Sequence, residues 1–255
     1  MRPASAGPLN SVFCGGIMGC VSTLRAFCGK IIGKSEMEGQ FMLTIRNETL
    51  ADRQAVEDVT RRAFYNVYVP GCTEHYLVHV MREHPDFIPE LDFVAELDGR
   101  IIGNVMYTRA TLTDEAGAVR DILTFGPVSI APEHQRRGYG RLLLEHSFRR
   151  AAELGWETVV IFGSPANYVG RGFKSCRKFN VCVEGGRFPS AMLVRELKEG
   201  ALDGRRWVYR DSPVMAIDVA EARRYDDALE PMAKEYRPSQ EEFYIMSRSA
   251  VDPDA

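Results

Sequence analysis

The chain has 255 residues, of which 45% are hydrophobic and 26% are charged, and its formal net charge is -3. This composition is typical of a soluble globular protein with enough apolar residues for a core of normal size. Because nucleic acids bind basic surfaces, the slightly acidic balance argues against nucleic acid as the main partner.

The cysteines are spaced unlike those of a zinc site or of a disulfide-rich secreted domain. No two of them form a Cys-x-x-Cys pair, and none combines with histidine at zinc spacing. They are Cys14, Cys20, Cys28, Cys72, Cys176 and Cys182. We therefore expect reduced thiols, no metal site and a cytoplasmic protein.

Residues 1–41 differ in character from the rest of the chain. The stretch 11–32 is rich in glycine, cysteine and small apolar residues, and Arg25 and Lys30 interrupt it, so it is too short and broken for a membrane span. A secretory signal stays open, although no clear cleavage site follows. We expect a poorly ordered extension or an artefact of start-site choice over 1–41, a main domain over 42–200, and a C-terminal extension over 201–255 that packs on it.

The first half of the domain predicts a strand, two helices and an antiparallel hairpin. The expected elements are a strand at 43–46, a helix from an N-cap at Asp52 to about Tyr65, a helix at 74–83 after Pro70-Gly71, and strands at 93–97 and 101–108. Asp98-Gly99 joins the two strands, and this pair favours a type I′ turn because glycine accepts a positive φ.

The second half predicts a long strand, a long helix and further strands. The expected elements are a strand at 122–130, a helix at about 137–154 that ends at Gly155 and buries Leu144, Phe148, Ala151 and Ala152, a buried strand at 158–162, a short helix at 167–171, and strands near 179–183 and 191–197. Gly126-Pro127 predicts a bulge or splay, because proline cannot donate to a strand ladder. A mostly irregular tail follows, with a capping box of Ser239 and Glu242.

The most informative segment joins the strand at 122–130 to the helix at 137–154. The helix begins at Gly138-Tyr139-Gly140, and a helix N-terminus presents unpaired N–H groups and a partial positive charge that attract anions. The two glycines let an oxyanion approach the backbone. The flanking basic residues are Arg136, Arg137 and Arg141. Gly-x-Gly alone is a weak signal that many nucleotide sites share. The segment is not a Walker loop, because no Gly-Lys-Ser/Thr follows, and it lacks the third glycine of a dinucleotide fingerprint.

Residues 135–140, Gln-Arg-Arg-Gly-Tyr-Gly, resemble the (Gln/Arg)-x-x-Gly-x-(Gly/Ala) motif of GNAT acetyltransferases. Residues 163–173, Gly-Ser-Pro-Ala-Asn-Tyr-Val-Gly-Arg-Gly-Phe, are similar to a Gly-Asp-Pro-x-Tyr-Tyr-x-Arg-Phe-Gly-Phe segment of the YhbS-like branch of that superfamily. Residues 74–96 and 125–140 also resemble that branch. The resemblance covers roughly 42–243 and leaves 1–41 outside.

The resemblance implies an α/β (α+β) fold, with a mixed, mostly antiparallel sheet that is splayed in the middle and has helices on both faces. It implies an N-acetyltransferase with acetyl-CoA as acyl donor and a primary amine of a small molecule or protein as acceptor, joined by direct attack on the thioester. It implies no membrane partner, and a homodimer stays open.

The resemblance also assigns roles to particular residues. The backbone of Val128 and Ile130 would pair with the pantetheine arm, and an N–H group near Val128 would polarise the thioester carbonyl. Tyr168 would act as general acid toward the leaving thiolate. The implied cofactor-binding set is Val128, Ser129, Ile130, Gln135, Arg136, Arg137, Gly138, Tyr139, Gly140 and Arg141. A packing tyrosine is the simpler alternative for Tyr168.

Other positions leave the chemistry open. Ser164 and Asn167 replace an aspartate and a tyrosine of the branch, so no cofactor role passes to Asn167. The candidates for the general base are Asp121, Glu96 and Glu74, and a structural or solvated carboxylate is the simpler interpretation of each. The candidates for the acceptor cleft are Glu74, His75 and His79, for which a surface pair or a stray metal site is the alternative.

Two functions from different classes remain after this comparison. The leading one is an acetyltransferase, which the intact Tyr168 favours. The rival is a noncatalytic acyl-CoA-binding or sensing module, which the changes at Ser164 and Asn167 keep open. A nucleotide-binding regulatory domain is a third reading, and the missing Walker features disfavour it.

Overall fold

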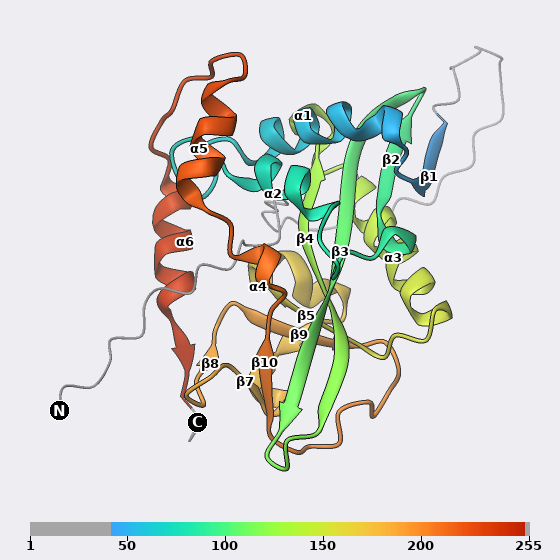
Figure 1. Ribbon diagram of the computed structural model, residues 1–255, viewed down its shortest axis with the longest axis vertical. Coiled ribbons are helices and arrows are strands. Elements are labelled where there is room, and N and C mark those ends of the chain that lie inside the picture. The colour runs from blue at the N-terminus through green and yellow to red at the C-terminus, as the bar shows by residue number, and fades with distance from the viewer. Residues whose placement is uncertain (1–41, 253–255) are drawn as a thin grey trace, which may run out of the picture.

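The computed structural model describes residues 42–252, which fold around a central sheet with helices on both of its faces (Figure 1). The strands of the sheet are β1 (Leu43–Asn47), β2 (Phe93–Leu97), β3 (Arg100–Asp114), β4 (Val119–Ile130), β5 (Thr158–Phe162), β6 (Lys174–Ser175), β7 (Val181–Cys182), β9 (Met192–Glu196) and β10 (Trp207–Arg210). A separate pair consists of β8 (Phe188–Pro189) and β11 (Ala250–Val251). The α-helices are α1 (Arg53–Phe64), α2 (Glu74–Met81), α3 (Tyr139–Glu153), α4 (Pro165–Tyr168), α5 (Val219–Asp227) and α6 (Pro238–Arg248). The expectations for 1–41 lie outside the described residues.

The sheet is mixed and mostly antiparallel. β1, β2, β3 and β4 run antiparallel in succession. β4 and β5 are parallel, whereas β9 pairs antiparallel with both β5 and β6. β10 lies antiparallel to β3 and parallel to β7. The predicted fold class is therefore confirmed.

Two glycine-containing pairs bend the chain where the sequence predicts. Asp98 and Gly99 have φ angles of 49° and 76°, both positive as a type I′ turn requires. The register of β3 against β4 shifts just after Val105, opposite Gly126-Pro127, whose peptide bond is cis. A bulge forms there because proline has no N–H group to donate to the ladder.

Alternate side chains of β3 enter cores on opposite faces of the sheet. The Tyr107 hydroxyl lies 2.7 Å from Ser147 Oγ of α3, on one face. Met106 packs with Leu77 of α2 on the other face. The sheet is therefore covered by α3 on one side and by α1 and α2 on the other (Figure 1).

The buried face of α3 differs by one position from the predicted face. Leu144, Phe148 and Ala151 are buried as expected, but Ala152 is exposed. Leu143 is buried instead. The apolar stripe through 144, 148 and 151 is wide enough to include Leu143, so this side chain also faces the sheet.

The prediction of an irregular tail is wrong, because β10, α5 and α6 follow residue 200. α5 buries Ala222 and Asp226, so its sequence carries too few apolar residues to show a helical stripe. α6 begins at Pro238, and Ser239 Oγ donates a hydrogen bond to the Val67 carbonyl at 2.8 Å instead of capping the helix.

Buried polar contacts hold α5 against α1 and α2. Arg61 Nε donates to Asp226 Oδ1 at 2.8 Å, and these side chains are 9% and 5% exposed. The Tyr225 hydroxyl donates to Glu57 Oε2 at 2.5 Å. α5 is therefore fixed to the rest of the domain by specific charges, whereas Trp207 of β10 and Phe243 of α6 join an apolar core.

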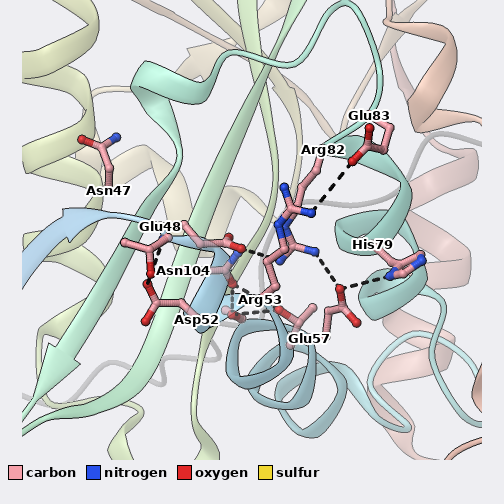
Figure 2. A network of polar contacts seen from close by, with 12 residues as sticks. Asn47, Glu48, Asp52, Arg53, Glu57, His79, Arg82, Glu83 and Asn104 are labelled. Atoms are coloured by element: carbon pink, nitrogen blue, oxygen red, sulfur yellow. Dashed lines mark hydrogen bonds and ion pairs between the residues drawn. The ribbon is translucent and has the colours of Figure 1, made fainter.

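Arg82 connects the C-terminal end of α2 to the end of β1 (Figure 2). Its guanidinium nitrogens lie 2.8 Å from Glu48 and 2.6 Å from Glu57, and all three side chains are buried. Burial raises the pKa of Asp92, which lies beside Glu48, to about 8, and it also raises the pKa of Glu48. One guanidinium faces three carboxyl groups, so Glu48 and Asp92 retain a proton between them at neutral pH.

Candidate active site

The loop between β4 and α3 forms an open cradle of backbone N–H groups. Gln135 Nε2 donates to the Ile130 carbonyl at 2.9 Å, which holds the loop against the end of β4. Arg136 and Gly138 have φ angles of 61° and 90°, and Gly138 is the N-cap of α3. A Cβ atom at Gly138 would meet no atom within 4 Å among the described residues. The first N–H groups of α3 therefore face an open space that an anion can enter.

The side chains around this cradle are mostly basic and accessible. Arg136 and Arg137 are exposed, and Tyr139 is half-buried. Arg141 Nε lies 3.7 Å from Glu145 Oε1, with the arginine side chain 63% exposed. Gly140 is buried at the base of α3. The structure thus brings residues 135–141 together at one helix N-terminus, as the sequence predicts.

Beyond its bulge, β4 has one edge that pairs with no strand in the described part of the chain. β4 and β5 are in register at a single residue pair, whereas β3 stays paired with β4 as far as Ile130. The N–H group of Ala131 donates to the Ile102 carbonyl at 2.7 Å and so points toward β3. Because successive backbone groups of a strand point to opposite edges, the N–H groups of Val128 and Ile130 point away from β3. They face the gap between the diverging β4 and β5.

Ser129 has a different environment from its two neighbours. Its hydroxyl donates to Asn104 Oδ1, which also accepts a hydrogen bond from Thr60 Oγ1 of α1 at 3.1 Å. All three side chains are buried on the α1 face of the sheet. The side chain of Ser129 therefore ties β4 to α1, and only its backbone borders the gap.

Tyr168 lies at the end of α4, just beyond β5. It is fully buried, with its ring centroid 5.8 Å from that of Phe125 and 5.6 Å from that of Phe173. Gly172 has a φ of 84°, and the Phe173 N–H group donates to the Tyr168 carbonyl at 3.3 Å. Phe125 immediately precedes the bulge, so the tyrosine ring lies where β4 and β5 separate.

His75 and His79 share one face of α2, as their spacing predicts, and α5 covers that face. The ring of Tyr225 lies 5.5 Å from His75 and 4.8 Å from His79. Burial lowers the pKa of His75 to about 4, which keeps it neutral at pH 7. Both histidines serve helix packing here, and a role in acceptor binding stays a prediction.

The three candidate bases have different surroundings. Asp121 and Glu96 form ion pairs with arginines at 3.7 Å and 2.7 Å. Glu74 is buried, accepts a hydrogen bond from the Thr73 N–H group at 2.9 Å, and has its pKa raised by burial to about 7. Glu74 is the first residue of α2, whose other end, at Arg82, lies beside Glu48 at the end of β1.

Sequence reasoning missed two sets of buried polar residues near the gap. Asn104 with Thr60 supports Ser129, and Thr108 faces Thr124 on the adjacent strand. The signal that could have found them is the presence of a polar residue inside an otherwise apolar strand.

Two further features are absent from residues 42–252. No group of three or more His, Cys, Asp and Glu side chains in this range could hold a metal ion. Helices that are long and apolar enough to cross a membrane are likewise absent from this part of the chain.

Residues 61–173 match the acetyltransferase (GNAT) family. The chain is 28% identical over 127 residues to YjhQ of Escherichia coli K12, described as an uncharacterised N-acetyltransferase. That match covers 49% of this chain and 66% of YjhQ, just under two thirds of its length. The chain is also 28% identical over 163 residues to YhbS of the same organism, which is likewise described as an uncharacterised N-acetyltransferase. That match covers 64% of this chain and 92% of YhbS.

Two solved structures share the fold. Escherichia coli YhbS in complex with CoA superposes with a TM-score of 0.60 and 23% identity, over 72% of this chain and 97% of YhbS. A GNAT family acetyltransferase of Brucella melitensis in complex with acetyl-CoA gives a TM-score of 0.54 and 21% identity, over 68% of this chain and 97% of that protein. The motif at the α3 N-terminus, the splayed sheet and these matches together establish that the chain contains a GNAT acetyltransferase domain homologous to YhbS and YjhQ.

Proposed function

We propose that this protein transfers the acetyl group of acetyl-CoA to a primary amine of a small molecule or protein. The observation that supports this most is the continuity of two backbone features, the free edge of β4 and the open N-terminus of α3. A ligand that carries amide groups at one end and phosphates at the other matches both in one extended pose.

The free edge of β4 suits the pantetheine arm. Its amides would pair with the backbone of Val128 and Ile130 as an added strand would. The pyrophosphate would then lie at the N–H groups from Arg136 to Gly140, with Arg137 and Arg141 in reach of the remaining charge. The complexes of the two structural relatives with CoA and acetyl-CoA support this assignment.

The reaction would proceed by direct attack of the unprotonated amine on the thioester carbonyl. Holding both reactants in one cleft would supply much of the rate enhancement. The N–H group of Val128 would stabilise the negative charge that develops on the carbonyl oxygen. As the carbon–sulfur bond breaks, Tyr168 would give its proton to the departing thiolate.

Glu74 is the candidate base whose surroundings fit the task. A carboxyl group with a pKa near 7 is partly ionised at neutral pH and can still receive a proton from an ammonium group. Asp121 and Glu96 each form an ion pair with an arginine, so their carboxylate oxygens already have a partner. Water would relay the proton if Glu74 does not contact the amine itself.

A noncatalytic acyl-CoA-binding module is the second candidate. The changes at Ser164 and Asn167 favour it, because they lie in the turn that carries Tyr168. An assay of CoA thiol release from acetyl-CoA with pooled amines, read together with mass spectrometry of the amines, separates the two functions. Thiol release matched by acetylated amine supports the enzyme, and bound acetyl-CoA without either product supports the binding module.

The cytoplasm is the compartment that we propose for this activity. Cys72, Cys176 and Cys182 have free thiols and are buried, which suits a reducing environment. Labelling of unfolded protein taken directly from cells with a thiol reagent would show all three cysteines reactive, whereas disulfides would contradict the proposal.

A further inference from the structure

The turn that begins at Tyr168, residues 168–173, is closed by its own backbone. The Gly172 N–H group donates to the Val169 carbonyl at 3.1 Å, and the Phe173 N–H group donates to the Tyr168 carbonyl at 3.3 Å. The helix α4 before it has only four residues, and so short a helix is marginal without tertiary contacts. The position of Tyr168 therefore depends on contacts that reach this Tyr168 turn from other parts of the fold.

Arg195 of β9 makes such a contact with the backbone of the turn. Its Nη1 donates to the Arg171 carbonyl at 2.8 Å. Its Nε lies 3.6 Å from where a Cβ atom would stand at Gly172, so the guanidinium lies against this glycine. β9 pairs with β5 along its whole length. The guanidinium therefore connects the Tyr168 turn to the central sheet.

The same guanidinium packs on the aromatic side chains that surround Tyr168. Its Cζ lies 4.3 Å from the ring centroid of Phe148 of α3. The ring of Phe148 lies 5.8 Å from that of Phe173, which in turn lies 5.6 Å from that of Tyr168. A planar guanidinium can stack on a ring while its N–H groups donate hydrogen bonds in the plane. One side chain thus restrains both the backbone of the turn and the rings beside Tyr168.

Packing alone does not account for a guanidinium at this position. Arg195 is half-buried, and among residues 42–252 no carboxylate forms an ion pair with it. Glu145, whose charge acts on Arg195, lies 3.7 Å from Arg141 Nε. Burial lowers the pKa of Arg195, which reflects the free-energy cost of taking its charge out of water. An apolar side chain could cover Phe148 without that cost, but it could not donate to the turn.

We propose that Arg195 is a positioning residue for Tyr168, which holds the Tyr168 turn so that the tyrosine hydroxyl meets the departing thiolate. This inference rests on the proposed acetyl transfer with Tyr168 as general acid. Arg195 acts through the turn and does not touch the reactants. A displacement of about 1 Å can lower a rate by about 10²-fold, so loss of this contact lowers turnover. Acetyl-CoA affinity stays unchanged, because the backbone of β4 and α3 would hold the cofactor.

Arg195→Met tests the inference, because methionine keeps a flexible apolar side chain over Phe148 and removes the donor. Turnover with the pooled amines, measured by CoA thiol release, should fall by about 10- to 100-fold, with the KM for acetyl-CoA unchanged. In a Tyr168→Phe background, Arg195→Met should lower turnover no further, because the acid that it positions is already absent.

Arg120→Met is the matched control. Arg120 of β4 is also half-buried, it donates to the Ala201 carbonyl, and its Cζ lies 5.0 Å from the ring centroid of Trp207. It therefore makes the same two kinds of contact with residues outside the Tyr168 turn. Arg120→Met should lower the melting temperature and leave turnover per folded molecule unchanged.

Hydrogen–deuterium exchange gives a second measurement that does not depend on activity. The Gly172 and Phe173 amides should exchange at least about tenfold faster in Arg195→Met than in the unmodified protein, and Arg120→Met should leave their exchange unchanged. Whatever the turnover, unchanged exchange of these two amides in Arg195→Met would overturn the inference.

The turnover measurements separate a failure of this inference from a failure of the proposed function. Losses that multiply when Arg195→Met and Tyr168→Phe are combined would show that Arg195 acts independently of the tyrosine, and so would overturn its positioning role. Normal turnover of Tyr168→Phe would contradict the proposed mechanism itself. A defective Tyr168→Phe beside a normal Arg195→Met would contradict only the role of Arg195.

Discussion

Tyr168 is the residue on which the proposed chemistry depends most. Tyr168→Phe retains the ring that packs on Phe125 and Phe173 and removes only the hydroxyl. Turnover should fall by about 10²- to 10⁴-fold, the usual contribution of a positioned acid. Acetyl-CoA affinity should stay unchanged, because the backbone of β4 and α3 would hold the cofactor.

Tyr107→Phe is the control for this variant. Tyr107 is also buried against Phe125, and its hydroxyl lies 2.7 Å from Ser147 Oγ. Its loss should lower the free energy of unfolding by about 1 kcal/mol and leave turnover per folded molecule intact. The assignment of Tyr168 as general acid fails if the two variants behave alike, each with a lower melting temperature and normal turnover.

Asp92 gives the fold a pH dependence that can be measured directly. An aspartate in the unfolded chain has a pKa of about 4, whereas burial beside Glu48 raises the pKa of Asp92 to about 8. As the pH rises through this window, the unfolded chain loses the proton first, so the folded state loses stability relative to it. Asp92→Asn removes the cost of charging this group.

Urea unfolding of Asp92→Asn and of the unmodified protein tests this sign. The variant's gain in free energy of unfolding should be small near about pH 4, grow with pH, and level off above about pH 8. Asp121→Asn, at an exposed position, should show no such growth. A gain that shrinks as the pH rises would show that Asp92 is held in its charged form.

At the scale of elements, the two ends of α3 offer a matched pair of glycines. Gly138 and Gly155 have φ angles of 90° and 87°, and a Cβ atom at either would meet no atom of residues 42–252 within 4 Å. Valine at either position strains the backbone to a similar extent. Gly138→Val also places a side chain where the pyrophosphate would approach the N–H groups.

Acetyl-CoA should raise the melting temperature of Gly155→Val and leave that of Gly138→Val unchanged. A ligand at about 100 times its Kd stabilises the folded state by about 2.7 kcal/mol, which such a measurement resolves. A full shift in Gly138→Val would remove the α3 N-terminus from the cofactor site.

The contact of α5 with α1 depends on one buried carboxylate. Asp226→Ala should lower the free energy of unfolding by about 3–5 kcal/mol, because it leaves the buried guanidinium of Arg61 without its partner. The adjacent Asp227 is 68% exposed and pairs with Lys234, so Asp227→Ala should cost less than about 1 kcal/mol. Chemical denaturation of both variants measures the difference, and equal losses would show that α5 is held by other contacts.

At the scale of the whole molecule, local chemistry decided what could be predicted. Asp98-Gly99, Gly126-Pro127 and the glycines at the start of α3 act through backbone geometry within a few residues, so the hairpin, the bulge and the start of the helix were predicted correctly, whereas the anion site there stays a prediction. The Tyr168 turn was located by its spacing to Gly172 and Phe173, although its catalytic role stays a prediction.

The missed features depend on residues distant in the chain. α5 is held by Asp226 against Arg61, a contact 165 residues apart that no local pattern records. His75 and His79 are correctly placed on one face, but the sequence does not show that Tyr225 covers it. β10 pairs with β3, and that pairing could not be predicted because the region after 200 showed no strand pattern.

The transfer of an isotopically labelled acetyl group tests the central claim most directly. The protein is mixed with labelled acetyl-CoA, with and without the pooled amines, and quenched within a few turnovers, and the label is traced in thioester, protein and amine. We predict that one CoA thiol appears for each acetylated amine, only when both reactants are present, and that no label stays on the protein. Label that stays in the thioester with every amine, although acetyl-CoA is bound, would contradict the account and leave a noncatalytic acyl-CoA-binding module.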